Sequence, residues 1–173
     1  MKSDELRALQ APIKASYRDN PDTARVTLKA EGNVGEGIVC SVQTGRALAE
    51  AGLHRATGGD GLSLCSGDML LEALVACAGV TLKAVATALG IELRSGKVLA
   101  EGDLDFRGTL GVAKDAPVGF SAIRLRFELD TEASAELVTK LIGLTERYCV
   151  VYQTLRAAPE IAVSSKILGE SDG

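Results

Sequence analysis

The chain has 173 residues, a length that favours a single domain spanning residues 1–173. Hydrophobic residues make up 46% and charged residues 24%, as in folded globular proteins rather than disordered ones. The formal net charge of −4, with 3% aromatic residues and no tryptophan, argues against a nucleic-acid partner or an anionic membrane surface. Both of those partners need clustered positive charge, and single-stranded nucleic acid also needs stacking rings.

The first ten residues, MKSDELRALQ, contain no apolar segment typical of a secretory signal. The longest apolar stretch, Met69–Val85, is interrupted by Glu72 and Lys83, which predicts a buried core helix rather than a membrane span. The four cysteines show no CxxC spacing, and the chain has one histidine. We therefore expect no metal site, and a cytoplasmic, reducing location in which the thiols are either packed or reactive.

The first part of the chain is predicted to form a helix, a hairpin and a loop. Apolar residues at near-helical spacing predict an amphipathic N-terminal helix within residues 1–20, from about Ser3 to Ser16. A hairpin follows, with a strand at Arg25–Ala30, a turn at Glu31–Gly35 and a return strand at Gly37–Val42. The glycine-rich Gly45–Gly67 is expected to be an irregular loop, and a loop this long is usually functional.

The strongest helical pattern runs from Asp68 to Leu89, with Asp68 in the first turn and Gly90 as the C-terminal cap. This helix has almost no polar face, which predicts that other parts of the protein surround it. Its small residues would let another backbone approach closely; they are Ala73, Ala76, Ala78 and Gly79.

The remaining elements are predicted in local groups. Strands are expected at about Ile91–Arg94, Lys97–Phe106 and Ala122–Asp130, the last from a clean apolar–polar alternation, with a loop at Gly108–Gly119. A helix at Glu132–Arg147, a helical segment at Cys149–Ala157, a strand at Ile161–Ile167 and a polar tail at residues 168–173 follow. Strands that come in groups rather than alternating with helices predict an α+β fold with mainly antiparallel pairing.

Two cysteines lie in contexts that bear on chemistry. Cys149 begins a helical segment, where the helix dipole favours the thiolate. Cys77 lies inside an apolar helix, where burial raises the pKa of a thiol, so it would need a cationic partner to become reactive. Taken alone, these residues also fit two thiols that are simply packed in the core.

Two segments resemble a known family. The sequence SGDMLLEALVAC, ending at Cys77, is similar to the pattern Ser-Pro-Gly-Glu-Leu-Leu-Leu-Ala-Ala-Leu-Ala-Gly-Cys of the OsmC/Ohr family of osmotically inducible and organic hydroperoxide resistance proteins. The sequence CVVYQTL, beginning at Cys149, is similar to that family's Cys-Pro-Val segment. The resemblance extends from about Arg25 to Ile167. It implies an antiparallel sheet wrapped around the long apolar helix, in an intertwined homodimer with active sites at the subunit interface.

The resemblance also implies a thiol-dependent peroxidase. Cys77 would be the peroxidatic cysteine, which attacks an organic hydroperoxide, and Cys149 the resolving cysteine, which then forms a disulfide with it. A dithiol reductant, lipoyl or thioredoxin-like, would restore both thiols. No metal, haem or flavin is implied, because sulfur is the redox centre.

The sequence departs from the family pattern at several positions. Gly67 stands where the hydroperoxidases carry a Glu, and Val150 replaces the family's Pro. Asp68 is then the candidate acid of the site, and Arg55, on the loop before the helix, is the candidate cation beside Cys77. These departures keep two alternatives open: binding of a small apolar molecule on the same scaffold, or a thiol sensor that forms the bridge without rapid turnover.

Overall fold

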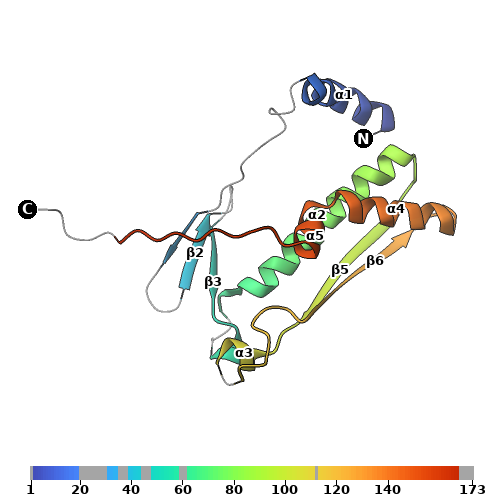
Figure 1. Cartoon of the computed structure of the whole chain (residues 1–173). Helices are drawn as coiled ribbons and strands as arrows, with labels where there is room; N and C mark the ends of the chain where they lie inside the picture. Colours follow the sequence, from blue (N-terminus) through green and yellow to red (C-terminus); the bar gives the residue numbers. More distant parts are fainter. Residues whose placement is uncertain are drawn as a thin grey trace, which may run out of the picture.

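The structure is a computed structural model that describes residues 2–19, 31–34, 39–43, 48–58, 62–111 and 113–167. Its longest element is α2 (Ser66–Leu89), which lies against the β5–β6 hairpin and against α4 and α5 (Figure 1). The N-terminal helix α1 spans Ser3–Asp19, three residues longer than the sequence predicts, and it also contacts α2.

The helix α2 begins and ends close to its predicted bounds. Cys65 is the N-cap, with extended backbone angles, and Asp68 lies in the first turn. Gly90 ends the helix in the left-handed conformation, with φ 71°, which glycine adopts without steric cost. The buried side chains recur every fourth residue and form one stripe: Leu74, Ala78, Leu82 and Ala86.

The strands β5 (Ser95–Asp103) and β6 (Ala122–Asp130) pair antiparallel over their full length. The predicted bounds of β6 are confirmed, because its side chains alternate between a partly buried and an exposed face. On the exposed face, the guanidinium of Arg124 pairs with the carboxylates of Asp103 and Glu101. The predicted strand Lys97–Phe106 ends early because the side chain of Asp105 caps a short helix, α3 (Phe106–Thr109), which begins at the last residue of the predicted strand and runs into the predicted loop.

The helices α4 (Ala135–Tyr148) and α5 (Val150–Arg156) confirm the predicted helix pair with a break between them. Ser134 caps α4 by accepting a hydrogen bond from the backbone N–H of Leu137. One core cluster joins α2, α4 and the residue after the α2 cap: Leu82, Ala86, Ile91 and Leu141. Both helices contact α2, and this packing places the break at Cys149 beside the middle of α2.

A second, smaller sheet precedes α2. Its strands are β1 (Glu31–Val34), β2 (Val39–Gln43), β3 (Leu48–Gly52) and β4 (Leu64–Cys65), in that order. The first three strands pair antiparallel, and β4 pairs parallel with β3. The mainly antiparallel α+β class is therefore confirmed.

Four sequence predictions concern this sheet and the chain around it. The turn predicted at Glu31–Gly35 is wrong over residues 31–34, which pair with β2 instead. The predicted loop Gly45–Gly67 contains β3, β4 and the 3-10 turn η2 (Arg55–Thr57), because pairing between strands overrides weak local propensity. The return strand is confirmed over its described part, whereas the predicted strand Arg25–Ala30 lies outside the described residues.

Two short strands predicted in the second half are not formed. Ile91–Arg94 is irregular, and Ile161–Ile167 is extended but unpaired and exposed. The alternation in Ile161–Ile167 suits a strand, but within the described residues no strand pairs with it.

The expectation that α2 is surrounded is not met within one chain. Only 22% of its most apolar 18-residue window is buried, and Val80 is 74% exposed. The helix is long and apolar enough to cross a membrane, a test that core helices of soluble proteins also pass. Within the described residues, the remaining apolar face of α2 has no cover.

Candidate active site

The structure brings together two of the four predicted site residues, Cys77 and Cys149. Cys77 lies half-buried in the middle of α2, and Cys149 lies in the break between α4 and α5, where it is 1% exposed. The two thiols are neighbours that shift each other's pKa, although they are 72 residues apart in the sequence. Because α5 packs on α2, the chain that leaves Cys149 runs directly past Cys77.

The pKa of the Cys77 thiol is lowered. Burial alone would raise this pKa, but hydrogen bonds from the backbone N–H of Val151, the thiol of Cys149, the backbone N–H of Val150 and the hydroxyl of Thr81 outweigh it. All four donors are neutral groups. The sequence expectation that Cys77 stays at or above its intrinsic pKa without a fixed cation is therefore wrong.

The pKa of the Cys149 thiol is raised, chiefly by burial and further by the neighbouring Cys77, although the backbone N–H groups of Tyr152 and Val151 oppose the rise. The expectation that Cys149 gains thiolate character at the start of α5 is wrong in sign. The first N–H groups of a helix have no acceptor within the helix. In α5, the N–H groups of Val150 and Val151 are directed to the sulfur of Cys77 and lower its pKa. The pair therefore has one thiol that ionises readily and one that stays protonated, an arrangement that separates a nucleophile from a hydrogen-bond donor.

The sequence analysis missed the donors around Cys77. Thr81 lies one turn after Cys77 on the same face of α2, a spacing of four residues visible in the sequence. The backbone N–H of Val150 could also have been noticed in the sequence, because the family's proline at this position would have no N–H. The direction in which α5 points could not be read from the sequence, because it depends on how α5 packs on α2.

The other two predicted residues lie away from the cysteine pair. Asp68 is exposed in the first turn of α2, nine residues before Cys77, which is about 13 Å along a helix axis. Arg55 begins η2, next to His54, and its side chain is outside the described part of the chain. Within one chain, the carboxylate of Asp68 therefore does not contact the sulfur of Cys77.

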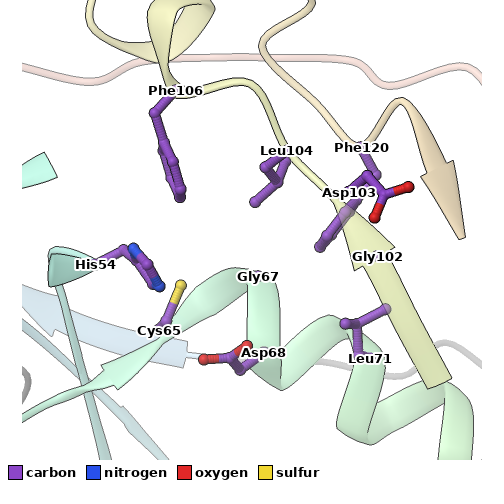
Figure 2. A pocket seen from close by; sticks show the side chains of 10 residues that line it. All are labelled: His54, Cys65, Gly67, Asp68, Leu71, Gly102, Asp103, Leu104, Phe106 and Phe120. Atoms are coloured by element: carbon purple, nitrogen blue, oxygen red, sulfur yellow. The ribbon is translucent and has the colours of Figure 1, made fainter. Parts of the chain in front are cut away.

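Asp68 instead lines a pocket of about 370 Å³ at the N-terminal end of α2, shown in Figure 2. His54 and Cys65 share this pocket, and their side chains point toward one another (Figure 2). Gly67, which stands in place of the family's Glu, also lines it; a Cβ atom there would lie 3.5 Å from the ring of Phe120. A larger side chain at position 67 would therefore occupy this pocket.

The remaining thiols and acids form no metal centre among the described residues, where no group of three or more His, Cys, Asp or Glu could hold an ion. Cys40 on β2 and Cys65 on β4 are separated by β3, so two strand spacings of about 9–10 Å lie between their backbones. A disulfide needs Cα atoms within about 7 Å. A bridge between Cys40 and Cys65 would therefore require the sheet to rearrange.

Comparison with known proteins agrees with this architecture. The family model described as OsmC-like protein matches residues 58–164, more than half of the chain. The chain therefore belongs to the OsmC-like protein family, which confirms the resemblance seen in its two cysteine segments. No curated protein matches it.

Several solved structures share the fold. An OsmC-like protein from Mycoplasma pneumoniae is 16% identical with a TM-score of 0.64, over 77% of this chain and 89% of that chain. The organic hydroperoxide resistance protein OsmC from Legionella pneumophila is 17% identical with a TM-score of 0.59, over 76% of this chain and 90% of that chain. An OsmC-like protein of unknown function from Vibrio cholerae is 12% identical with a TM-score of 0.60, over 75% of this chain and 94% of that chain. Identities this low establish a common fold and leave the activity to be argued from the site.

Proposed function

We propose that this protein is a thiol-dependent peroxidase that reduces organic hydroperoxides through Cys77 and Cys149. The observation that carries the proposal is the contact between a thiol of lowered pKa, Cys77, and a buried thiol of raised pKa, Cys149. Similarity in fold to a protein named for organic hydroperoxide resistance supports it.

In the proposed reaction, the Cys77 thiolate attacks the terminal oxygen of the hydroperoxide. The O–O bond breaks, the alkoxide leaves and takes up a proton to become an alcohol, and Cys77 becomes a sulfenic acid. The Cys149 thiol then attacks the sulfenic sulfur, water leaves, and a Cys77–Cys149 disulfide forms. A dithiol of the lipoyl or thioredoxin-like class reduces this disulfide in the cytoplasm and is itself oxidised to a disulfide.

The raised pKa of Cys149 fits the resolving role. While Cys77 is ionised, the protonated Cys149 donates a hydrogen bond to it instead of repelling it as a second thiolate. Once Cys77 is a sulfenic acid, its negative charge is gone, and the Cys149 thiol is already placed at the sulfur that it must attack. The substrate is expected to be apolar, because Ala76, Ala78 and Val80 surround Cys77 in the sequence.

The proposed enzyme acts as a homodimer with its active sites at the interface. The apolar face of α2, with Val80 74% exposed, is the surface that a second copy would cover. Asp68 lies about 13 Å from Cys77 along α2, so an acid–thiol contact requires the Cys77 of another subunit. Arg55 follows His54, which shares the pocket of Asp68, so both proposed residues come from the same end of α2.

Stopped-flow consumption of cumene hydroperoxide with a dithiol tests the reaction. We expect turnover by the wild type, none by Cys77→Ser, and a single burst without steady turnover by Cys149→Ser. Equal turnover by Cys77→Ser and the wild type would refute the proposal.

Co-expression tests whether Asp68 acts between subunits. A heterodimer of Cys77→Ser and Asp68→Asn chains contains one site with both an intact Cys77 and an Asp68 from the other chain. Activity well above that of either parent supports the arrangement between subunits, whereas activity no higher than the better parent contradicts it.

A groove lined by residues of β6 and α5 favours a second candidate, the binding of an apolar molecule. The groove has a volume of about 450 Å³, and Ile123, Leu125 and Phe127 of β6 face Tyr152 and Leu155 of α5 across it. If Cys77 and Cys149 are inert toward peroxide while a fluorescent fatty acid binds, this candidate replaces the peroxidase. A Cys77–Cys149 bridge that forms without steady turnover would instead identify a thiol sensor.

A further inference from the structure

The break between α4 and α5 redirects one backbone N–H that a continuous helix would use. In a continuous helix, each N–H donates to the carbonyl four residues earlier. The N–H of Cys149 still does so, to the carbonyl of Thr145 at 2.9 Å. The next N–H, that of Val150, is directed to the sulfur of Cys77. Its helical acceptor would have been the carbonyl of Glu146, in the last turn of α4.

The side chain of Gln153 donates to that carbonyl instead. Its Nε2 lies 2.7 Å from the carbonyl oxygen of Glu146, at the short end of the range for an N–H···O hydrogen bond. The backbone N–H of Gln153 donates to the carbonyl of Cys149 at 3.0 Å. Gln153 therefore bonds to both sides of the break, to α4 through its side chain and to Cys149 through its backbone.

These bonds favour the broken backbone over the continuous one. Cys149 has an extended ψ of 110°, whereas a continuous helix would need a helical angle there. Carbonyls in the last turn of a helix have no donor within the helix and take one from nearby groups. When Gln153 supplies the donor for Glu146, the chain at Cys149 does not need to become helical to satisfy that carbonyl.

We propose that Gln153 is a positioning residue for the thiolate of Cys77. Its side-chain amide replaces the N–H of Val150 on the carbonyl of Glu146. That N–H then stays directed to the sulfur of Cys77. Gln153 acts through Val150 rather than on the sulfur itself. A role of Gln153 in peroxide reduction rests on the proposed function, whereas its effect on the thiolate does not.

The surroundings of Cys77 make this effect measurable. The N–H of Val150 is one of several neutral donors that lower the pKa of the Cys77 thiol. Among the described groups that shift this pKa, Cys149 is the one that titrates, and its own pKa is raised. A change in the direction of the Val150 N–H should therefore appear as a change in the pH dependence of Cys77 reactivity.

Gln153→Met tests the role of the side-chain donor. Methionine keeps the length and helix propensity of glutamine but has no N–H to donate. Alkylation of Cys77 by iodoacetamide is followed by site-resolved mass spectrometry over a range of pH. We expect the profile to move toward higher pH, with alkylation about threefold slower below the pKa. Thr154→Ala, at an exposed neighbouring position on α5, should match the wild type. An unchanged profile for Gln153→Met would overturn the proposal.

A double variant separates this role from a general loosening of α5. Val150→Pro has no N–H at position 150, and its ring would clash with the carbonyl four residues earlier in a continuous helix. The break then no longer depends on Gln153. Adding Gln153→Met to Val150→Pro should therefore leave the alkylation of Cys77 at the rate of Val150→Pro alone. A further loss as large as in the wild-type background would also overturn the proposal.

The alkylation assay needs no peroxide, so its outcome is independent of the peroxidase proposal. An unchanged Gln153→Met profile in a protein that turns over cumene hydroperoxide would refute the positioning role alone. Slower alkylation of Cys77 in Gln153→Met, with no peroxide turnover by the wild type, would support the positioning role and refute the peroxidase.

Discussion

At the scale of single residues, the chemistry depends on which thiol receives the donors of α5. Local sequence context placed Cys149 at a helix start and Cys77 in an apolar helix, and it wrongly favoured the thiolate at Cys149, whereas the family resemblance assigned the nucleophile to Cys77. The location of both cysteines was predictable, because each lies in a recognisable local segment. The direction of the two pKa shifts was not, because the backbone N–H groups of Val150 and Val151 are near Cys149 in the sequence but serve Cys77 in space.

Val150→Pro removes one of these donors with little other change. The side chain of Val150 is 69% exposed, and proline suits the first position of a helix. Cys149, with φ −74° and ψ 110°, already has backbone angles close to those favoured before proline. A hydrogen bond to a charged group contributes about 1.5 kcal/mol or more, so we expect roughly tenfold slower alkylation of Cys77 by iodoacetamide below its pKa.

Val150→Ala is the matched control for that variant, since it shortens the side chain and keeps the N–H. Iodoacetamide should alkylate Cys77 of this variant at the wild-type rate. If the Pro and Ala variants show the same Cys77 reactivity across pH, the amide of Val150 does not stabilise the thiolate.

The hydroxyl of Thr81 also lowers the pKa of Cys77, by less than the backbone N–H groups do. Because the pKa of Cys77 is lowered, the rate of peroxide consumption should rise with pH and level off below the usual thiol range, and it should fall as the thiolate is protonated at lower pH. Thr81→Val should shift this profile toward higher pH, and Thr81→Ser should restore it. Thr87→Val on the same helix, where the native hydroxyl bonds the carbonyl of Lys83, is expected to leave the profile unmoved.

At the scale of elements, predictions succeeded where a strong local pattern and the tertiary packing agree. The alternation of β6 and the cap at Gly90 are examples, and both were predicted to the residue. Predictions failed at β1 and in the extended Ile161–Ile167. Residues 31–34 have turn-forming composition but pair with β2, and Ile161–Ile167 has strand composition but no partner strand in the described chain.

The packing of α4 on α2 is what holds Cys149 in place, and it can be tested by truncating one side chain. Leu141 is fully buried against Leu82, Ala86 and Ile91. Leu141→Ala should lower the free energy of unfolding by about 2–5 kcal/mol, measured by denaturant titration. Leu137→Ala on the same helix, at a position that is 42% exposed, should cost far less; equal losses would mean that Leu141 does not belong to the core.

At the scale of the whole molecule, the described part of the chain leaves much of α2 exposed, although the composition of this helix predicts that it is buried. The sequence predicts that something covers α2, because the helix is apolar all round. The described residues of one chain bury a single stripe of it, and we propose that a second copy covers the rest. The length of the chain and the spacing of its motifs carry no information on where the two copies would touch.

Val80→Glu tests the proposed dimer at that face. The substitution places a charge on the exposed side of α2. A charge there has little effect on the stability of a free chain, but it strongly destabilises an apolar interface. Sedimentation equilibrium should show a dimer for the wild type and a monomer for Val80→Glu. Lys140→Glu, on the exposed surface of α4, should remain dimeric, and a dimeric Val80→Glu would place the interface elsewhere.

The most direct test of the central claim is a single-turnover measurement on the cysteine pair. Reduced protein is mixed with one equivalent of cumene hydroperoxide, and its disulfides are mapped by mass spectrometry. The account predicts rapid loss of two thiols per chain and one Cys77–Cys149 disulfide, with no disulfide in Cys77→Ser. Both thiols remaining reduced, or oxidation at another cysteine while Cys77 stays a thiol, would contradict it.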